Sequence, residues 1–496
     1  MKHQTPFILS IDQGTTSSRA ILFSRTMDIV DISQKELTLH YPENGWVEQD
    51  ANDIWNDTLE VCREVIKQSG ANDISAIGIT NQRETVVVWD KNTGNPIYNA
   101  IVWQDRRTAE YCRQLKSAGH EENIQQKTGL LIDPYFSATK IKWMLDNVDG
   151  ALQKAQAGDL LCGTVDCFLI WKLTGGSVHA TDATNASRTM LFNIQSHEWD
   201  KELLELFNIP MSMLPEVKDN VANFGTTDPS HLGQSIPITG AAGDQQAALI
   251  GQACFATGMV KSTYGTGCFA LMNIGDQFKL SQNKLLTTIA YRFDGKTTYA
   301  LEGSIFIAGA AIQWLRDQLQ IINHAGETDA LAQSVDDNGG VYMVPAFTGL
   351  GAPYWQPDAR ATITGLTRNA GRAHIARAAL EAQAYQTCDL VKAMEKDSGQ
   401  KLKDMRVDGG MVANDWMCQF LADMTAVNVD RPPIIETTAL GAAYLAAIGA
   451  GWFGSILDIT SAWSAERSFA PTMSGALRDK LYDGWQSAVK QTLAGL

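Results

Sequence analysis

The sequence contains no Cys-x-x-Cys pair, although eight cysteines are spread over its 496 residues. Scattered cysteines of this kind are typical of reduced, buried thiols, so we expect neither a disulfide framework nor a metal–thiolate site. The longest uncharged stretch, residues 439–454, is shorter than the roughly 20 residues of a membrane-spanning helix. The apolar run near the N-terminus is short and is broken by Asp12, which does not fit a signal peptide. These features predict a cytoplasmic protein that is not an integral membrane protein.

Basic residues are in the minority. The 40 Lys and Arg against 55 Asp and Glu give a formal net charge of −15, which argues against nucleic acid or an anionic membrane surface as a partner. Three catalytic motifs are also missing: the Gly-x4-Gly-Lys-Ser/Thr loop, the Gly-x-Ser-x-Gly elbow and the zinc-binding His-Glu-x-x-His. A Walker-type nucleotide loop is therefore excluded, and nothing indicates a serine hydrolase or a zinc peptidase.

The features that are present predict an α/β protein with two domains. A chain of 496 residues is too long for one hydrophobic core. Strand-like runs alternate with helical ones in the first half, which favours α/β layers. The expected strands are 77–79, 86–89 and 100–103, and the expected helices are 53–68, 105–118 and 137–147.

Residues 7–23 predict a β-hairpin with a polar turn between the apolar runs 7–11 and 20–23. Gly14 lets the backbone approach a ligand, Arg19 can bind phosphate oxygens as a fork, and Asp12 can hold a hydrated Mg²⁺. The remaining turn residues offer N–H groups and hydroxyls to phosphate: Thr15, Thr16, Ser17 and Ser18. Alone, the segment could be a plain polar turn. With the other features of the chain, it resembles the first phosphate loop of the actin, hexokinase and sugar-kinase superfamily and predicts ATP.

A second turn rich in glycine and threonine, residues 262–268, lies between the strand-like segments 258–261 and 269–273. It matches a dinucleotide fingerprint formally, but that motif needs a helix where 269–273 is strand-like. One phosphate hairpin in each half indicates a duplicated architecture with a cleft between the halves. We place the boundary near 250–258, which gives domains of residues 1–252 and 253–496. Small residues in 241–251 and 439–450 would let two linking helices cross closely, as in a hinge.

Residues 407–414 predict a strand, a tight glycine turn and the start of a helix. Gly409 and Gly410 can admit a flat purine against the backbone, and Asn414 can add a polar contact. A structural strand-to-helix turn is the alternative. On the purine interpretation, Gly309 and Gln313 would line the other side of the nucleotide.

Candidate groups for substrate chemistry lie elsewhere in the sequence. Asp244 follows Gly243, where a carboxylate could accept the proton of an alcohol; an aspartate after glycine is as often a helix N-cap. Arg83 and Glu84 combine donors with an acceptor, as a small polyol requires, although a surface ion pair or a polar strand end is commoner. The aromatic residues Trp103 and Tyr135 follow turn or strand-like segments, and core packing is the usual role of such side chains.

Eight blocks in the same order carry a resemblance to the FGGY carbohydrate-kinase family over nearly the whole chain. They are residues 12–19, 80–85, 101–104, 133–137, 243–246, 262–269, 345–355 and 408–410. The resemblance implies two ribonuclease-H-like (actin-like ATPase) α/β domains that close over an active-site cleft. It also implies an ATP- and Mg²⁺-dependent kinase that converts glycerol to sn-glycerol 3-phosphate, and a homodimer or homotetramer.

The resemblance assigns roles residue by residue. Arg83, Glu84, Tyr135, Asp244 and Gln245 would hydrogen-bond the glycerol hydroxyls, and Trp103 and Phe269 would pack against its carbon chain. Asp244 would be the general base and Asp12 would organise Mg²⁺. The nucleotide would be held by Thr15, Thr16, Arg19, Thr266, Gly309, Gln313, Gly410 and Asn414.

Two alternatives and two departures from the family pattern stay open. An FGGY kinase for a pentulose would share the ATP residues and Asp244, whereas an actin-like assembly protein would not need the polyol set. Some relatives bind fructose 1,6-bisphosphate through an arginine that segment 229–237 lacks, so that control is not expected here. His231 invites comparison with a phosphorylated histidine of other relatives, but a solvated loop histidine is favoured. Segment 471–484 also differs from the version that docks a phosphotransferase regulator.

Overall fold

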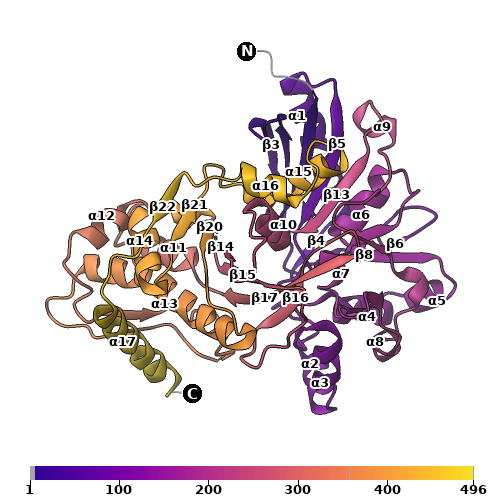
Figure 1. Ribbon diagram of the computed structural model, residues 1–496. Helices are drawn as coiled ribbons and strands as arrows, with labels where there is room; N and C mark the ends of the chain where they lie inside the picture. Colours follow the sequence, from indigo (N-terminus) through magenta and orange to yellow (C-terminus); the bar gives the residue numbers. More distant parts are fainter. Residues whose placement is uncertain (1–5, 357, 495–496) are drawn as a thin grey trace.

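The computed structural model describes residues 6–356 and 358–494 and consists of two α/β units joined through a shared core (Figure 1). The first unit is built on a five-stranded sheet of order β13-β5-β1-β2-β3. Its strands are β1 (Phe7–Gln13), β2 (Ser17–Phe23), β3 (Ile29–Glu36), β5 (Ile74–Asn81) and β13 (Ile238–Gly243). The second unit is built on a seven-stranded sheet of order β16-β17-β15-β14-β20-β21-β22. Its strands are β14 (Val260–Tyr264), β15 (Cys268–Gly275), β16 (Leu286–Phe293), β17 (Lys296–Ile305), β20 (Met405–Asp408), β21 (Val429–Arg431) and β22 (Arg467–Phe469).

The two sheets repeat one topology. In the first, β1 pairs antiparallel with β2 and β2 with β3, whereas β5 and β13 are added in parallel. In the second, β14, β15 and β17 form the antiparallel part, and β20 and β21 are added in parallel. This five-strand core is the ribonuclease-H-like arrangement, so the predicted fold class and duplicated architecture are confirmed.

Helices cover the sheets and fill the insertions between repeat elements. Those of the first unit are α1 (Ala51–Ser69), α2 (Ala109–Ser117), α3 (Glu121–Thr128), α4 (Ser137–Asn147), α5 (Ala151–Gln156), α6 (Val165–Leu173), α7 (Ala183–Ala186), α8 (Lys201–Phe207), α9 (Pro229–Leu232) and α10 (Asp244–Gly251). Those of the second are α11 (Gly309–Asp317), α12 (Glu327–Gln333), α13 (Arg372–Ser398), α14 (Asp415–Thr425), α15 (Thr437–Gly449), α16 (Ile456–Ala462) and α17 (Gly475–Leu493). A four-stranded sheet in the first unit contains β4 (Glu48–Gln49), β7 (Ala100–Ile101), β6 (Val86–Asp90) and β8 (Leu160–Thr164). Three two-stranded ladders complete the fold: β9 (Ala180–Asp182) with β12 (Glu216–Lys218), β10 (Phe192–Asn193) with β11 (Glu198–Trp199), and β18 (Tyr342–Val344) with β19 (Thr362–Thr364).

Helix α1 shows how local sequence sets an element. The Asp50 carboxylate caps its first turn by accepting the Asn52 amide, and Gly70 ends it in the left-handed region at φ 67°. Between these ends the helix buries one face, which includes Ile54, Val61 and Val65. The predicted range 53–68 therefore falls inside α1, and the range 137–147 coincides with α4.

The boundaries of three other segments differ from the prediction. The strand expected at 100–103 is reduced to Ala100–Ile101, because Val102 leaves the ladder and bonds to Val47. The helix expected from 105 begins only at Ala109, since the Asp105 carboxylate accepts the amide of Arg107, two residues further on, in a turn that precedes the helix. The strand expected from 258 begins at Val260, because Gly258 has a φ of 88°.

The last helices of the two repeats, α10 and α15, cross at glycine. A Cβ on Gly441 would lie 1.8 Å from the Ala247 carbonyl oxygen, and one on Gly251 would lie 2.1 Å from the Thr437 carbonyl oxygen. The two backbones are thus in direct contact. Helix α15 also packs against β1, β5 and β13 of the other unit, and in Figure 1 this yellow helix lies beside the indigo strands. The close crossing predicted from the small residues is confirmed.

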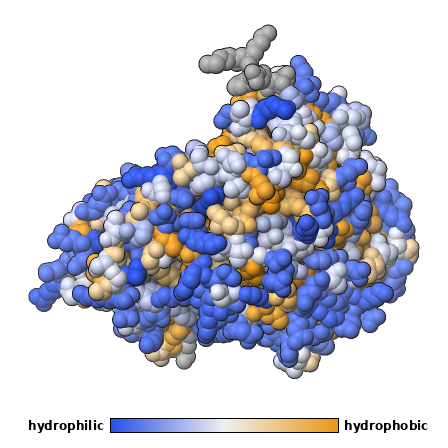
Figure 2. Space-filling view, viewed as in Figure 1, coloured by the Kyte–Doolittle hydropathy of each residue, from blue (hydrophilic) through white to orange (hydrophobic). Residues whose placement is uncertain are grey.

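The state of the cysteines and the polarity of the surface agree with what the sequence predicts. All eight cysteines are free and buried. Among the described residues, no helix has the length and apolar character needed to cross a membrane. The face shown in Figure 2 is largely hydrophilic, with apolar side chains gathered where α15 and α16 lie in Figure 1.

Candidate active site

The first phosphate hairpin joins β1 to β2. The Gly14 amide closes the turn by donating to the Ser17 carbonyl at 2.9 Å. The Thr15 hydroxyl accepts the indole N–H of Trp103 at 2.9 Å, and Thr16 is exposed. Arg19 pairs with Glu436, which lies just before α15. The hairpin is therefore tied both to the predicted polyol residue Trp103 and to the crossing helices.

The second hairpin joins β14 to β15. The Gly265 amide donates to the Gly267 carbonyl, two residues further on, at 2.9 Å, whereas Gly14 donates to the carbonyl three residues further on. The Thr266 carbonyl accepts the amides of Ala308 and Ala310, so Thr266 lies against the start of α11. The segment 269–273 is a strand, which removes the dinucleotide interpretation.

Glycines bring three chain segments together beside this hairpin. A Cβ on Gly309 would lie 2.6 Å from the Gly265 carbonyl oxygen. Gly409 has a φ of 90°, and a Cβ there would lie 2.5 Å from the Tyr264 carbonyl oxygen. Only glycine fits either approach. Gly410 and Gln313 are exposed, Gln313 lying on α11.

Asn414 has a structural role. Its side-chain oxygen accepts the Met417 amide at 2.9 Å and so caps α14, while its amide nitrogen donates to Thr328 at 3.1 Å. The predicted strand, glycine turn and helix start at 407–414 are confirmed. A nucleotide contact from Asn414 stays a prediction.

The predicted polyol residues Arg83 and Glu84 are buried, 2% and 1% exposed, so the surface ion-pair alternative is wrong. They follow the end of β5, and Glu84 has a φ of 60°. Positive φ is costly for a residue with a side chain and is typical of functional sites. The Arg83 guanidinium reaches Asp244 at 3.1 Å and Tyr135 at 3.5 Å. Three separate segments of the first unit thus meet at Arg83.

Asp244 is the first residue of α10, and Gly243 is the N-cap. The N-cap alternative for Asp244 is therefore wrong. Its side chain is 30% exposed. Burial, opposed by the charges of Arg83 and Lys261, raises the pKa of this carboxyl above its ordinary value. A carboxylate with a raised pKa accepts a proton more readily than a free aspartate does.

Aromatic rings line the same region. The Trp103 ring lies 5.5 Å from Tyr135 and 6.3 Å from Phe269, both edge-on, as measured between ring centroids. Phe269 lies on β15 of the second unit, so the cluster spans both units. Gln245 accepts a hydrogen bond from Lys261. Lys261 lies on β14, the strand next to β15, and thus also belongs to the second unit.

Three charged residues of this site carried no motif in the sequence. Glu302, on β17, accepts Arg83 through both oxygens, at 2.6 and 3.1 Å. Arg188, just after α7, donates to Glu84 at 2.6 Å and to Glu302 at 2.9 Å. Lys261 is fully buried. Glu302 could have been noticed in the sequence, as the single charged residue in the strand-like segment 299–305.

Asp12 is the residue predicted to hold Mg²⁺. Burial, opposed by Arg19 and reinforced by Glu436 and Asp244, raises the pKa of Asp12 to about 6. No cluster of three or more metal-ligating side chains occurs in the part of the chain that the structure describes. Mg²⁺ commonly uses only one or two carboxylates and keeps several waters. The Asp12 carboxylate is an oxygen ligand of the kind that Mg²⁺ takes, so it fits that ion.

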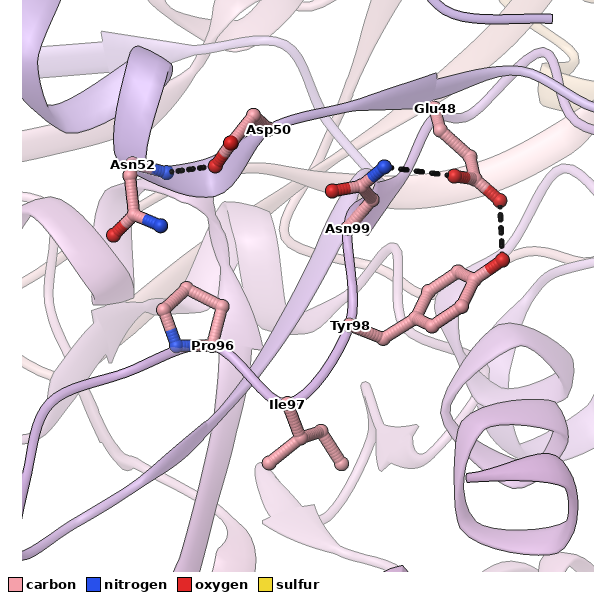
Figure 3. A pocket seen from close by; sticks show the side chains of 7 residues that line it. All are labelled: Glu48, Asp50, Asn52, Pro96, Ile97, Tyr98 and Asn99. Atoms are coloured by element: carbon pink, nitrogen blue, oxygen red, sulfur yellow. Dashed lines mark hydrogen bonds between the residues drawn. The ribbon is translucent and has the colours of Figure 1, made fainter. Parts of the chain in front are cut away.

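A cavity of about 330 Å³ lies between the β4–α1 junction and residues 96–99 (Figure 3). It is lined by Glu48, Asp50, Asn52, Pro96, Ile97, Tyr98 and Asn99. Its two carboxylates are already engaged: Glu48 accepts Tyr98, Asn99 and Arg107, and Asp50 caps α1. The cavity contains none of the predicted site residues.

Comparison with known proteins identifies the family. The model of the FGGY family of carbohydrate kinases, N-terminal domain, matches residues 7–251, and that of the C-terminal domain matches residues 260–450. The chain belongs to the FGGY family of carbohydrate kinases.

Individual relatives within the FGGY family cover nearly the whole chain. A glycerol kinase of Rhodospirillum rubrum is 59% identical over 99% of this chain and 100% of its own length. A solved Plasmodium falciparum glycerol kinase with ADP has a TM-score of 0.94 at 40% identity, covering 98% of each chain. A ligand-bound xylulose kinase of Lactobacillus acidophilus has a TM-score of 0.90 at 23% identity, covering 98% of each chain, and thus shares the FGGY fold.

The FGGY segment at 229–237 differs from expectation in one respect. His231 is half-buried on α9, where its ring lies 5.0 Å from that of Trp55 and its Nε2 lies 3.0 Å from the Lys172 carbonyl oxygen. It is therefore a packed residue and not a solvated loop histidine.

Proposed function

We propose that this chain transfers the γ-phosphoryl group of ATP to a terminal hydroxyl of glycerol, forming sn-glycerol 3-phosphate. The observation that carries the proposal is the convergence of Arg83, Glu84, Asp244 and Tyr135 beside two phosphate hairpins. Glycerol kinases that are 58–60% identical over nearly the full chain support the same substrate.

Each residue of the polyol site has its own role in the transfer. Asp244 is the general base that accepts the proton of the attacking hydroxyl, next to Arg83, which orients that hydroxyl. Glu84 accepts Arg188 at Oε1, which leaves its second oxygen to accept a glycerol O–H. Trp103 and Phe269 pack against the carbon chain, and Tyr135 and Gln245 add hydrogen bonds. Positioning and charge neutralisation supply most of the rate in such transfers.

The nucleotide would lie between the hairpins. Thr15, Thr16, Ser17 and Arg19 would hold phosphate on the first side, and Thr266, Gly309, Gln313, Gly410 and Asn414 would hold the nucleotide on the other. Asp12 would hold Mg²⁺, which would supply charge neutralisation at the phosphates. Closing the units over the substrates would exclude water and limit hydrolysis.

Domain division, assembly and location complete the proposal. The domains are residues 1–252 and 253–496, with α15 packed across their boundary. A homodimer or homotetramer is the expected assembly, which light scattering measures. The free, buried cysteines support a cytoplasmic location.

ADP production from Mg-ATP tests the function directly. We expect strong turnover with glycerol and little with dihydroxyacetone, xylulose or no acceptor. A preference for xylulose would keep the family and the ATP site but replace the substrate. ADP release without any acceptor would favour an actin-like assembly protein.

Truncating Arg83 is expected to weaken glycerol binding. Replacing Arg83 by Met keeps much of the apolar stem but removes charge-assisted hydrogen bonds, which are worth about 1.5–3 kcal/mol. The KM for glycerol should rise, while the KM for ATP should stay near that of the wild type. Steady-state kinetics with each substrate varied in turn measures both. An unchanged glycerol KM would remove Arg83 from the polyol site.

A further inference from the structure

Glu302 joins the two units at the polyol end of the cleft. It lies on β17 of the second unit's sheet, whereas both of its arginine partners belong to the first unit. Figure 1 shows β17 at the junction of the two units. The neighbouring strand β16 also contacts the first unit, since the Thr287 amide donates to the Gly129 carbonyl at 2.9 Å. Glu302 is thus the second unit's charged contribution to a site built mainly by the first.

The carboxylate fixes both arginines at once. Its two oxygens accept Nη1 and Nη2 of Arg83, and Oε1 also accepts Nη2 of Arg188 at 2.9 Å. All three side chains are at most 2% exposed. Burial would raise the pKa of Glu302, but the charges of Arg188 and Arg83 outweigh it and lower that pKa to about 2. The carboxylate therefore stays ionised over the whole working range of pH.

The orientation of Arg83 depends on this contact. With its two terminal nitrogens engaged by Glu302, the guanidinium plane is set and Nε faces Asp244 at 3.1 Å. Arg188 in turn holds Oε1 of Glu84, and its own Nη1 is buried without a partner among the described residues. The two arginines and the two glutamates balance in charge, so removing one of them would leave an uncompensated buried charge.

We propose that Glu302 is the positioning residue of the polyol site, holding Arg83 and Arg188 in the geometry that binds glycerol. This inference rests on the proposed function. Glu302 itself need not touch the substrate, because its effect passes through Arg83, Arg188 and Glu84. Its removal should therefore affect the polyol and leave the nucleotide hairpins unaffected.

The test compares two carboxylates of the second unit. Glu302→Gln removes the charge at nearly constant shape, and Glu302→Asp keeps the charge but shortens its reach. Glu381→Gln is the matched control, since Glu381 is also 1% exposed and pairs with an arginine, Arg377, at 2.9 Å. Glycerol affinity without nucleotide is measured by calorimetry, and both KM values and kcat are measured by ADP release. Thermal melting reports folding.

We expect both Glu302 variants to weaken glycerol binding about 10- to 100-fold, as the loss of charge-assisted hydrogen bonds predicts. The ATP KM should remain within about twofold of the wild type, because Glu302 acts only through residues of the polyol site. General damage to the fold would instead raise both KM values. Glu381→Gln should lose stability without a change in glycerol affinity. If Glu302→Gln does not fold, Glu302→Asp decides the question.

Two results would overturn the inference while leaving the proposed function intact. One is an unchanged glycerol affinity in the folded Glu302 variants. The other is a parallel loss of ATP and glycerol binding, which would make Glu302 a general stabilising residue. Failure of the wild type to phosphorylate glycerol would instead remove the proposed function and this inference with it.

Discussion

The Asp244→Asn variant is expected to fold like the wild type and to lose about 10²- to 10⁴-fold in turnover of glycerol. Asparagine keeps the shape of the side chain but cannot accept the proton of the attacking hydroxyl. The loss should fall on kcat, because Arg83, Glu84 and the aromatic residues still bind the polyol. Steady-state ADP release at saturating ATP and glycerol measures the effect.

The fold should tolerate this change because Asp244 does not cap its helix. Gly243 occupies the cap position, and within its own turn the Asp244 carboxylate accepts the amide of the next residue, Gln245, at 2.6 Å. Its ion pair with Arg83 at 3.1 Å becomes a neutral contact in the asparagine variant. A matched control is Asp458→Asn in the first turn of α16, whose carboxylate accepts the amides of Gly454 and Ser455. That variant should retain full turnover. Near-normal turnover of Asp244→Asn would remove Asp244 from the role of base.

The same assignment predicts the acid side of the pH–rate profile. A base must be ionised, so activity falls as pH drops through the pKa of Asp244. Burial raises that pKa against the opposing charges of Arg83 and Lys261. The fall should therefore occur at a higher pH than the usual aspartate pKa of about 3.9. Its absence down to that pH would contradict a raised pKa at the base.

The features that the sequence predicts correctly are those whose geometry is local. A hairpin turn needs its glycine, hydroxyls and flanking strands within about 15 residues, so both phosphate hairpins were visible from the sequence. The crossing helices were visible for a similar reason, because a close approach requires small residues in each helix. In both cases the physical constraint acts on neighbours in the chain.

The buried charge cluster could not be found in this way. Arg83 and Glu302 are separated by 219 positions, and Arg188 and Glu302 by 114. Of the three, only Glu302 is an isolated charge next to apolar residues, since Arg83 stands beside Glu84 and Arg188 lies in a polar segment. The sequence does not show which charges compensate one another, because the partners are fixed only by the three-dimensional fold. The environment of Asp244, and hence the direction of its pKa shift, is equally a product of the fold.

The Gly441→Ala variant is expected to lose about 3 kcal/mol of unfolding free energy, at the upper end of the usual cost of overpacking. The added Cβ would lie 1.8 Å from the Ala247 carbonyl oxygen and 3.0 Å from the Gly251 amide nitrogen. These are backbone atoms, so rotation of a side chain cannot relieve the overlap. Helices α10 and α15 must move apart, and thermal or denaturant melting measures the cost.

The displacement should also reduce activity, because the crossing helices carry groups of the site at their ends. Asp244 begins α10, and Glu436, the partner of Arg19, immediately precedes α15. Gly475→Ala in α17 is the matched control: its nearest neighbour is the flexible end of Arg478 at 3.6 Å, so stability should hold or rise slightly. Wild-type stability in Gly441→Ala would mean that the two helices separate freely. The crossing of α10 and α15 would then not be a tightly packed hinge, and closure of the units would not depend on it.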